Sequence, residues 1–152
     1  MIRGIEHVGL SVSSMDRAVE FYRNAFGMEL VSRSRFCEGS YEYAKKMAIL
    51  GLKDASGESA LLRLGDMQIE LFEFASPQPK LAEPNRPVCD HGISHFCLQV
   101  ADMQEEYARL KAAGVVFHCE PQHFPGQALV TYGRDPDGNV FELLEWIKAP
   151  VR

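Results

Sequence analysis

The chain has 152 residues, of which 46% are hydrophobic and 24% charged, a composition typical of a folded globular protein. This composition excludes an intrinsically disordered chain, and no apolar run approaches the roughly 20 residues that span a bilayer. The formal net charge is −5 and the basic residues are scattered, which argues against nucleic acid or a membrane as a partner. The four cysteines show no CxxC spacing and no signal peptide is recognisable, so we expect reduced thiols and a cytoplasmic location.

The first half of the chain begins with a strand followed by a helix. Residues 5–12, IEHVGLSV, predict the strand. Apolar residues at helical spacing then predict a helix over 14–26, with Ser13 or Ser14 as its N-cap and Gly27 as its C-cap.

Residues 41–52 predict a second, short helix, followed by a polar loop over 53–59. This insertion either covers a cleft or is a surface excursion. A turn at Gly65-Asp66 then leads into a strand over 67–73, MQIELFE.

The second half repeats this pattern. Residues 93–100, ISHFCLQV, match the first strand, a helix is expected over 102–113, and the turn DPDG leads into 139–145, NVFELLE. Four prolines fall within SPQPKLAEPNRP, which is typical of a linker. We therefore expect one domain over 1–152, built from a module at 1–76, a linker at 77–89 and a module at 90–148.

Each half carries one His on its first strand and one Glu on its last strand. These residues are His7 and Glu70 in the first half, and His95 and Glu142 in the second. A single such residue is usually an ordinary polar residue, but here both types recur at equivalent places in two copies of one unit. If the copies pair about a pseudo-two-fold axis, the four side chains converge in one cleft. Two imidazoles and two carboxylates suit a divalent first-row transition metal.

These segments resemble the vicinal oxygen chelate superfamily, which includes glyoxalase I, methylmalonyl-CoA epimerase, extradiol dioxygenases and bleomycin resistance proteins. The resemblance covers nearly the whole chain, and DPDGN followed by FEL is its most specific marker. It implies an α+β fold of two βαβββ modules whose sheets form a metal-binding cleft, and a homodimer. By the same resemblance, His7, Glu70, His95 and Glu142 match the four metal ligands of bacterial glyoxalase I. The ion would be zinc, nickel, cobalt, manganese or iron.

Strand alternation predicts the side chains that share a face with the four ligands. These candidate substrate-binding residues are Ser11, Phe72, Phe74, Cys97, Gln99, Leu144 and Trp146, with Tyr132 on a neighbouring strand. The row is mostly apolar and aromatic, so we expect a small, partly apolar substrate. Glyoxalase I holds glutathione carboxylates with an Arg and an Asn where this chain has Ser11 and Phe74. This departure argues against glutathione.

The resemblance leaves three functions open. The first is a lyase or isomerase that transfers a proton next to a carbonyl through a metal-bound enediolate, with Glu142, and Glu70 second, as the catalytic carboxylate. The second is an extradiol dioxygenase with iron on His7, His95 and Glu142 and with Tyr132 in catalysis. Glu70 would then be a surplus ligand. The third is a non-catalytic binder of a small molecule such as an antibiotic.

Overall fold

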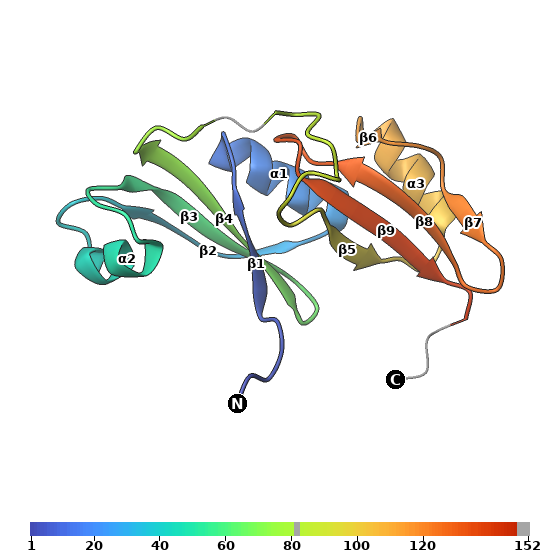
Figure 1. The fold of residues 1–152 in the computed structure, drawn as a ribbon, viewed down its shortest axis with the longest axis horizontal. Coiled ribbons are helices and arrows are strands. Elements are labelled where there is room, and N and C mark those ends of the chain that lie inside the picture. Colours follow the sequence, from blue (N-terminus) through green and yellow to red (C-terminus); the bar gives the residue numbers. More distant parts are fainter. Residues whose placement is uncertain (81–82, 149–152) are drawn as a thin grey trace. The chain divides into compact units, whose positions relative to one another are not determined.

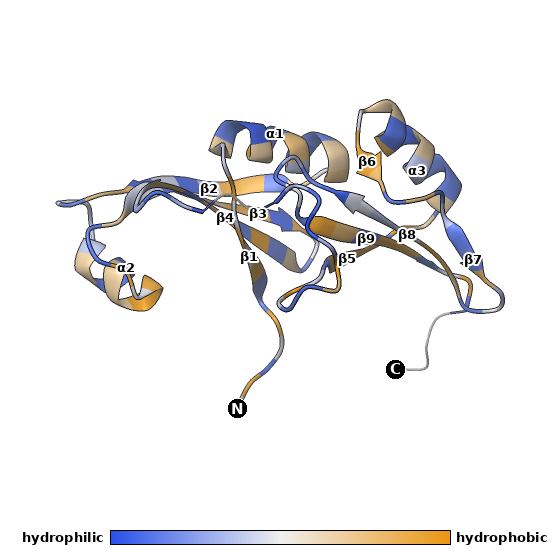
Figure 2. Ribbon diagram, turned by 45° about the horizontal axis from the view of Figure 1, so that its top comes forward, coloured by the Kyte–Doolittle hydropathy of each residue, from blue (hydrophilic) through white to orange (hydrophobic). Residues whose placement is uncertain are grey.

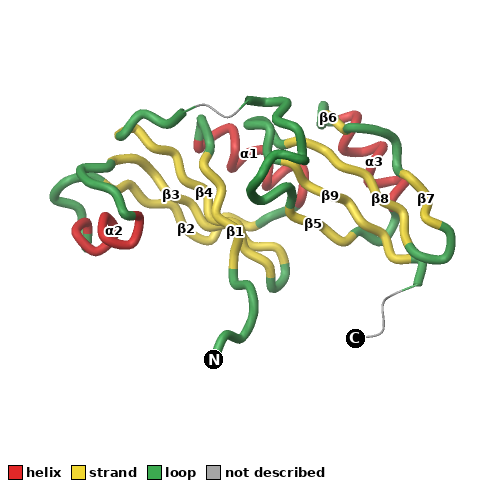
Figure 3. Tube along the Cα trace, viewed as in Figure 1, coloured by secondary structure: helices red, strands yellow, loops and turns green. Residues whose placement is uncertain are grey.

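The computed structural model describes residues 1–80 and 83–148 (Figure 1). The chain divides into two compact units, Met1–Leu81 and Ala82–Arg152, which we call unit 1 and unit 2. Each unit contains its own β-sheet, with α1 and α2 packed on the sheet of unit 1 and α3 on that of unit 2 (Figure 3). The predicted α+β class is therefore confirmed.

Unit 1 is a four-stranded sheet with the order β1-β4-β3-β2, in which β1 runs parallel to β4 and the other neighbours are antiparallel. Its elements are β1 (His7–Ser11), α1 (Met15–Phe26), β2 (Glu29–Phe36), α2 (Tyr43–Leu50), β3 (Ser56–Leu64) and β4 (Met67–Ser76). This is a βαβββ unit with α2 inserted before the final hairpin.

Helix α1 begins and ends where the sequence predicts. The Ser14 side chain accepts from the backbone of Arg17, and Gly27 ends the helix in the left-handed conformation at φ 68°. The Glu73 carboxylate in β4 accepts from the Met15 backbone N–H at 2.6 Å, which ties the helix N-terminus to the sheet. Polar and apolar residues alternate along α1 (Figure 2). Its buried face packs on one side of β3 and β4.

Helix α2 packs on the other side of this sheet. Its buried Met47 forms a small core with Phe36 and Ala55, against which Phe72 and Phe74 of β4 also pack. Because successive strand residues point to opposite faces, Phe72 and Phe74 lie on the face opposite Glu73 and α1. The insertion therefore covers part of the face that carries the candidate site residues of unit 1.

The polar loop predicted over 53–59 is partly wrong. Strand β3 already begins at Ser56, and Ser59 is buried opposite Phe72. This stretch is polar, but it pairs with both β2 and β4, and Glu58 is neutralised by two arginines of β2. Such non-local pairing leaves no periodic signal in the local sequence.

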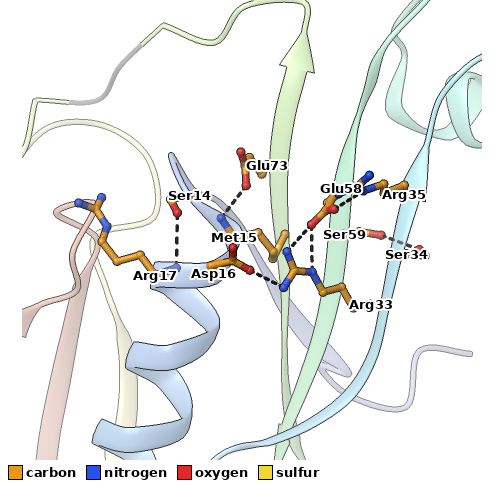
Figure 4. Close-up of polar contacts among 10 residues, drawn as sticks. All are labelled: Ser14, Met15, Asp16, Arg17, Arg33, Ser34, Arg35, Glu58, Ser59 and Glu73. Carbon is orange, nitrogen blue, oxygen red and sulfur yellow. Dashed lines mark hydrogen bonds and ion pairs between the residues drawn. The ribbon is translucent and has the colours of Figure 1, made fainter.

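The Glu58 carboxylate accepts from Arg35 Nε at 2.5 Å and from Arg33 Nη2 at 2.6 Å, while Arg33 also reaches Asp16 (Figure 4). The Arg35 and Arg33 guanidinium groups lower the pKa of Glu58. A carboxyl whose pKa is lowered in the folded state stabilises the fold above its unfolded pKa and loses that contribution as the pH falls through its folded pKa.

We therefore expect Glu58→Gln to lower the urea midpoint near pH 7, because the arginines lose their anionic partner. The difference from wild type should shrink as the pH falls from about 4.5 towards 3, because Glu58 becomes increasingly protonated as the pH approaches its lowered folded pKa. Urea denaturation at both pH values measures this, with Glu20→Gln on the exposed side of α1 as the charge-matched control. A difference that is the same at both pH values would contradict the prediction.

Unit 2 repeats the strand–helix–strand order of unit 1. Its sheet has the order β5-β9-β8-β6, with β7 also paired to β8, and β5 runs parallel to β9. Its elements are β5 (Phe96–Gln99), α3 (Met103–Ala112), β6 (Val116–Phe117), β7 (Gln122–Phe124), β8 (Ala128–Arg134) and β9 (Val140–Trp146). Asp102 caps α3, and the Glu145 carboxylate accepts from the Met103 backbone N–H at 2.8 Å, just as Glu73 does for Met15.

The predicted DPDG turn joins β8 to β9. The Asp135 carboxylate accepts from the backbone N–H groups of Asp137 at 2.9 Å and Asn139 at 2.8 Å. Gly138 adopts φ 85°, where an added Cβ would lie 2.5 Å from the Pro84 carbonyl oxygen. The turn therefore fixes the point at which β9 starts, and with it the position of Glu142.

Candidate metal centre

His7 and Glu70 lie side by side in unit 1. Parallel pairing of β1 with β4 sets Gly9 opposite Glu70, so His7 lies one pleat away on the same face. The His7 Nε2 atom is 3.4 Å from Glu70 Oε2, and the two side chains are 42% and 32% exposed. An imidazole nitrogen and a carboxylate oxygen are thus held together where solvent reaches both.

His95 and Glu142 form the equivalent pair in unit 2. His95 directly precedes β5, and β5 pairs with β9 so that Cys97 lies opposite Glu142. The His95 Nε2 atom is 3.1 Å from Glu142 Oε2, and these side chains are 28% and 16% exposed. The same atoms therefore meet in both units, as the internal repeat predicts.

Both distances suit two ligands of one metal ion. Donors at roughly 2.1 Å from zinc lie about 3.0 Å apart at a right angle and about 3.4 Å apart at a tetrahedral angle. Across residues 1–80 and 83–148, no third His, Cys, Asp or Glu joins either pair as a metal-binding group. Each unit thus supplies two of the four predicted donors, and the meeting of all four on one ion stays a prediction.

The residue before each His contacts its Nδ1 atom. The Glu6 carboxylate contacts His7 Nδ1, and the Ser94 hydroxyl lies 2.9 Å from His95 Nδ1. Both contacts leave Nε2 on the side of the neighbouring Glu. Glu6 and Ser94 are not among the residues predicted for the site, although a polar residue before the His in both repeats is a signal visible in the sequence.

The unit 1 candidates for substrate binding share the face of Glu70. Ser11 is exposed in β1 and lies opposite Phe72 in β4. Phe72 and Phe74 are half-buried and stack with ring centroids 5.9 Å apart, and Phe36 packs edge-on to Phe74 at 5.7 Å. Much of this aromatic surface is therefore used in holding α2.

The unit 2 candidates share the face of Glu142. Pairing in the sheet sets Tyr132 and Cys97 opposite Glu142, and Gln99 opposite Leu144. Helix α3 packs on the other face, where it meets Glu145. Leu144 is half-buried and Trp146 is exposed. This face presents apolar and hydrogen-bonding groups beside the His–Glu pair.

Tyr132 and Cys97 are neutral groups beside this pair. The Tyr132 hydroxyl is 3.5 Å from His95 Nε2, and the two rings lie 4.7 Å apart. Partial removal from water, with the Glu142 carboxylate, raises the pKa of Tyr132 and raises the pKa of the thiol of Cys97, an exposed residue, to about 12. Cys97 is therefore a thiol at neutral pH and a poor nucleophile, whereas Tyr132 can donate a hydrogen bond.

His118 and Arg134 lie towards the far edge of the same sheet. The His118 ring is 6.1 Å from that of Tyr132, and burial together with Arg134 lowers the pKa of His118. Arg134 donates to the carbonyl oxygens of Gly138 and Arg86. Arg134 thus has structural partners within unit 2. Arg35 likewise has one within unit 1, because it pairs with Glu58.

The sequence of this chain matches a known protein family over most of its length. The model of the Glyoxalase/Bleomycin resistance protein/Dioxygenase superfamily matches residues 4–143. A lactoylglutathione lyase of Neisseria meningitidis is 23% identical over 91% of this chain and 88% of its own length. A 2-epi-5-epi-valiolone epimerase from Actinomyces is 30% identical over 71% of this chain and 57% of its own length.

Solved structures share the fold. A glyoxalase family protein from Bacillus cereus matches with a TM-score of 0.82 at 25% identity, covering 96% of this chain and 95% of that one. The fosfomycin resistance protein FosX from Listeria monocytogenes matches with a TM-score of 0.65 at 21% identity, covering 97% of both chains. In the part of the chain that the structure describes, no helix is long and apolar enough to cross a membrane. The match over residues 4–143, together with the repeated strand–helix–strand unit, shows that this chain belongs to the Glyoxalase/Bleomycin resistance protein/Dioxygenase superfamily.

Proposed function

We propose that the protein is a divalent-metal-dependent enzyme that transfers a proton at a carbon next to a carbonyl, as a lyase or isomerase. The observation that carries this proposal is the duplicated pair, with Nε2 to Oε2 distances of 3.4 Å and 3.1 Å. Two imidazoles and two carboxylates form a complete donor set for one ion, which favours an enzyme over a pure binder.

In this proposal each residue has a defined task. His7, Glu70, His95 and Glu142 would hold the ion, which would supply a Lewis acid that stabilises negative charge on the substrate oxygen. The Glu142 carboxylate takes the proton as general base and returns it as general acid, with Glu70 as the second choice. Tyr132 donates a hydrogen bond to the substrate from beside His95.

The substrate is expected to be small, with adjacent oxygens and a partly apolar body. Ser11, Phe72, Phe74, Cys97, Gln99, Leu144 and Trp146 are the other proposed contacts. We expect Leu144 and Trp146 to take most of the apolar body, because Phe72 and Phe74 already pack against α2. Ser11 and Phe74 offer no cation to an anionic glutathione, so a glutathione adduct is not the expected substrate.

Assembly and location belong to the same proposal. We expect one functional domain over 1–152 formed by modules at 1–76 and 90–148 joined by a linker at 77–89. We expect it to act as a cytoplasmic homodimer on a small molecule. Nucleic acid and membrane are not expected partners, given the net charge of −5 and the scattered basic residues.

The test is turnover under strict anaerobiosis with zinc as the only metal, since proton transfer needs no redox change. A panel of 2-hydroxy- and 2-methyl-carbonyl compounds is incubated in deuterated water. Deuterium is expected at the carbon next to the carbonyl with wild type, and about 10²–10⁴-fold more slowly with Glu142→Gln. The absence of exchange across the panel in a zinc-loaded protein would count against the proposal.

An extradiol dioxygenase is the second candidate, and the Tyr132 hydroxyl beside His95 is the observation in its favour. That reaction requires iron(II) and dioxygen. Activity on catechols only with both, and its near-complete loss in Tyr132→Phe, would replace the first proposal. Tight ligand binding without turnover by either route would instead identify a binding protein.

A further inference from the structure

The Glu6 carboxylate is held from two sides. One oxygen contacts His7 Nδ1 and the other contacts Gln68 Nε2. Gln68 is the cross-strand partner of His7, so both contacts come from the same rung of the β1–β4 pair. Glu6 is 67% exposed, yet these contacts fix its carboxylate against the imidazole.

This contact determines which nitrogen of His7 can bind a metal. A neutral imidazole carries one ring proton, and the nitrogen without it has the free lone pair. An Nδ1–H that donates to Glu6 leaves the Nε2 lone pair available, and Nε2 is the atom 3.4 Å from Glu70. A carboxylate partner of this kind also makes the imidazole a stronger donor to a metal.

In unit 2 a neutral hydroxyl, which can either donate or accept, takes the corresponding place. Ser94 occupies the place of Glu6, and its neutral hydroxyl is 2.9 Å from His95 Nδ1. Hydrogen bonds to an ionised group are roughly twice as strong as those between neutral groups. The two histidines are therefore supported unequally, although their Nε2 atoms face equivalent glutamates.

We infer that Glu6, braced by Gln68, is a positioning residue that holds His7 in its Nδ1–H tautomer and makes His7 the more firmly held imidazole ligand of the metal. This inference rests on the proposed function for the metal itself. The contact between Glu6 and His7 is independent of that function.

The experiment uses the full-length protein and zinc. The dissociation constant for zinc is measured by competition with a chromophoric chelator for wild type, Glu6→Ala, Glu6→Gln and Ser94→Ala. Glu20→Gln, which removes an exposed carboxylate from α1, is the charge control. We expect Glu6→Ala to weaken zinc binding about 10- to 100-fold, the range seen for such partners of metal-bound histidines. Glu6→Gln, which keeps an acceptor oxygen, and Ser94→Ala should lose less, and Glu20→Gln should match wild type.

Nitrogen-15 NMR of the histidine rings supplies a readout that a general loss of stability would not change. In zinc-loaded wild type, His7 is expected to show a protonated Nδ1 whose exchange with water is slow, and Glu6→Ala should speed that exchange. Unchanged zinc affinity in Glu6→Ala, or His7 bound through Nδ1, would overturn the inference. Failure of wild type to bind zinc would overturn the proposed function. In that case the metal-free protein still tests the contact. Slow exchange of the His7 Nδ1–H in wild type, lost in Glu6→Ala, would show that Glu6 holds the ring. Fast exchange of this proton in metal-free wild type would refute the contact between Glu6 and His7 as well.

Discussion

Zinc affinity is expected to fall at least about 100-fold when Glu142 is replaced by alanine, because a direct ligand should matter at least as much as the partners that orient ligands. The substitution removes the carboxylate that lies 3.1 Å from His95 Nε2 and leaves one donor of that pair. Chelator competition gives the affinity, and the circular dichroism spectrum shows whether the variant is folded.

Glu145→Ala is the matched control for this prediction. Glu145 lies on the same strand, but its side chain points to the opposite face and accepts from the Met103 backbone. Its loss should cost some stability through α3 and leave zinc affinity unchanged. Equal zinc affinity in wild type and Glu142→Ala would exclude Glu142 as a ligand.

Among the glycine-to-alanine substitutions in unit 1, Gly57→Ala is expected to be the most destabilising. A Cβ at Gly57 would lie 2.0 Å from the Glu73 carbonyl oxygen and 3.0 Å from Phe74 Cα. Both atoms belong to the β4 backbone, which cannot move aside as a flexible side chain can. Overpacking typically costs 1–3 kcal/mol, and we expect about 3 kcal/mol here, a loss of roughly 6–12 °C in melting temperature.

Gly9→Ala is the control, because it makes the same substitution at a position with room for a methyl group. Gly9 lies in β1 of the same sheet with a φ outside the left-handed region, and an added Cβ would meet no atom within 4 Å. Its melting temperature should stay within about 2 °C of wild type, in keeping with a surface substitution. If both variants melt alike, the close contact between β3 and β4 at Gly57 is wrong.

The sequence predicts elements best where their signals are local. Helix α1 follows from the helical spacing of its buried residues, the Ser14 cap and Gly27, all within one short segment. Helix α2 is shorter than the predicted 41–52, and the start of β3 at Ser56 was missed. The end of α2 is set locally by Gly51, which adopts the left-handed conformation at φ 65°. The start of β3 instead depends on pairing with β2 and β4, which periodicity along one segment does not report.

In the candidate site, too, some features could be predicted from the sequence and others could not. Repetition in two halves marks His7, Glu70, His95 and Glu142, and the structure places each His beside its Glu within its own unit. The contact of Glu6 with the His7 ring could not be predicted from hydrophobic patterning, because an exposed Glu before a strand carries no periodic signal.

The packing of α2 on the aromatic residues of unit 1 could be seen only in the structure. Phe72 and Phe74 are predicted substrate contacts in a mostly apolar and aromatic row, and strand alternation does place them on the face of Glu70. Their packing against α2 is a contact between distant segments of unit 1. The sequence left open whether this insertion covers a cleft or is a surface excursion. Part of the aromatic row predicted from strand alternation is therefore covered by α2.

The stoichiometry of metal binding tests the central claim, that two His–Glu pairs serve one ion, most directly. Metal-free protein is titrated with zinc, and elemental analysis after gel filtration gives the ions bound per chain. We predict one zinc per chain in wild type, and its loss from both His7→Ala and His95→Ala, although these residues lie in different units. Two ions per chain, no bound metal, or tight binding that survives in either variant would contradict a shared site.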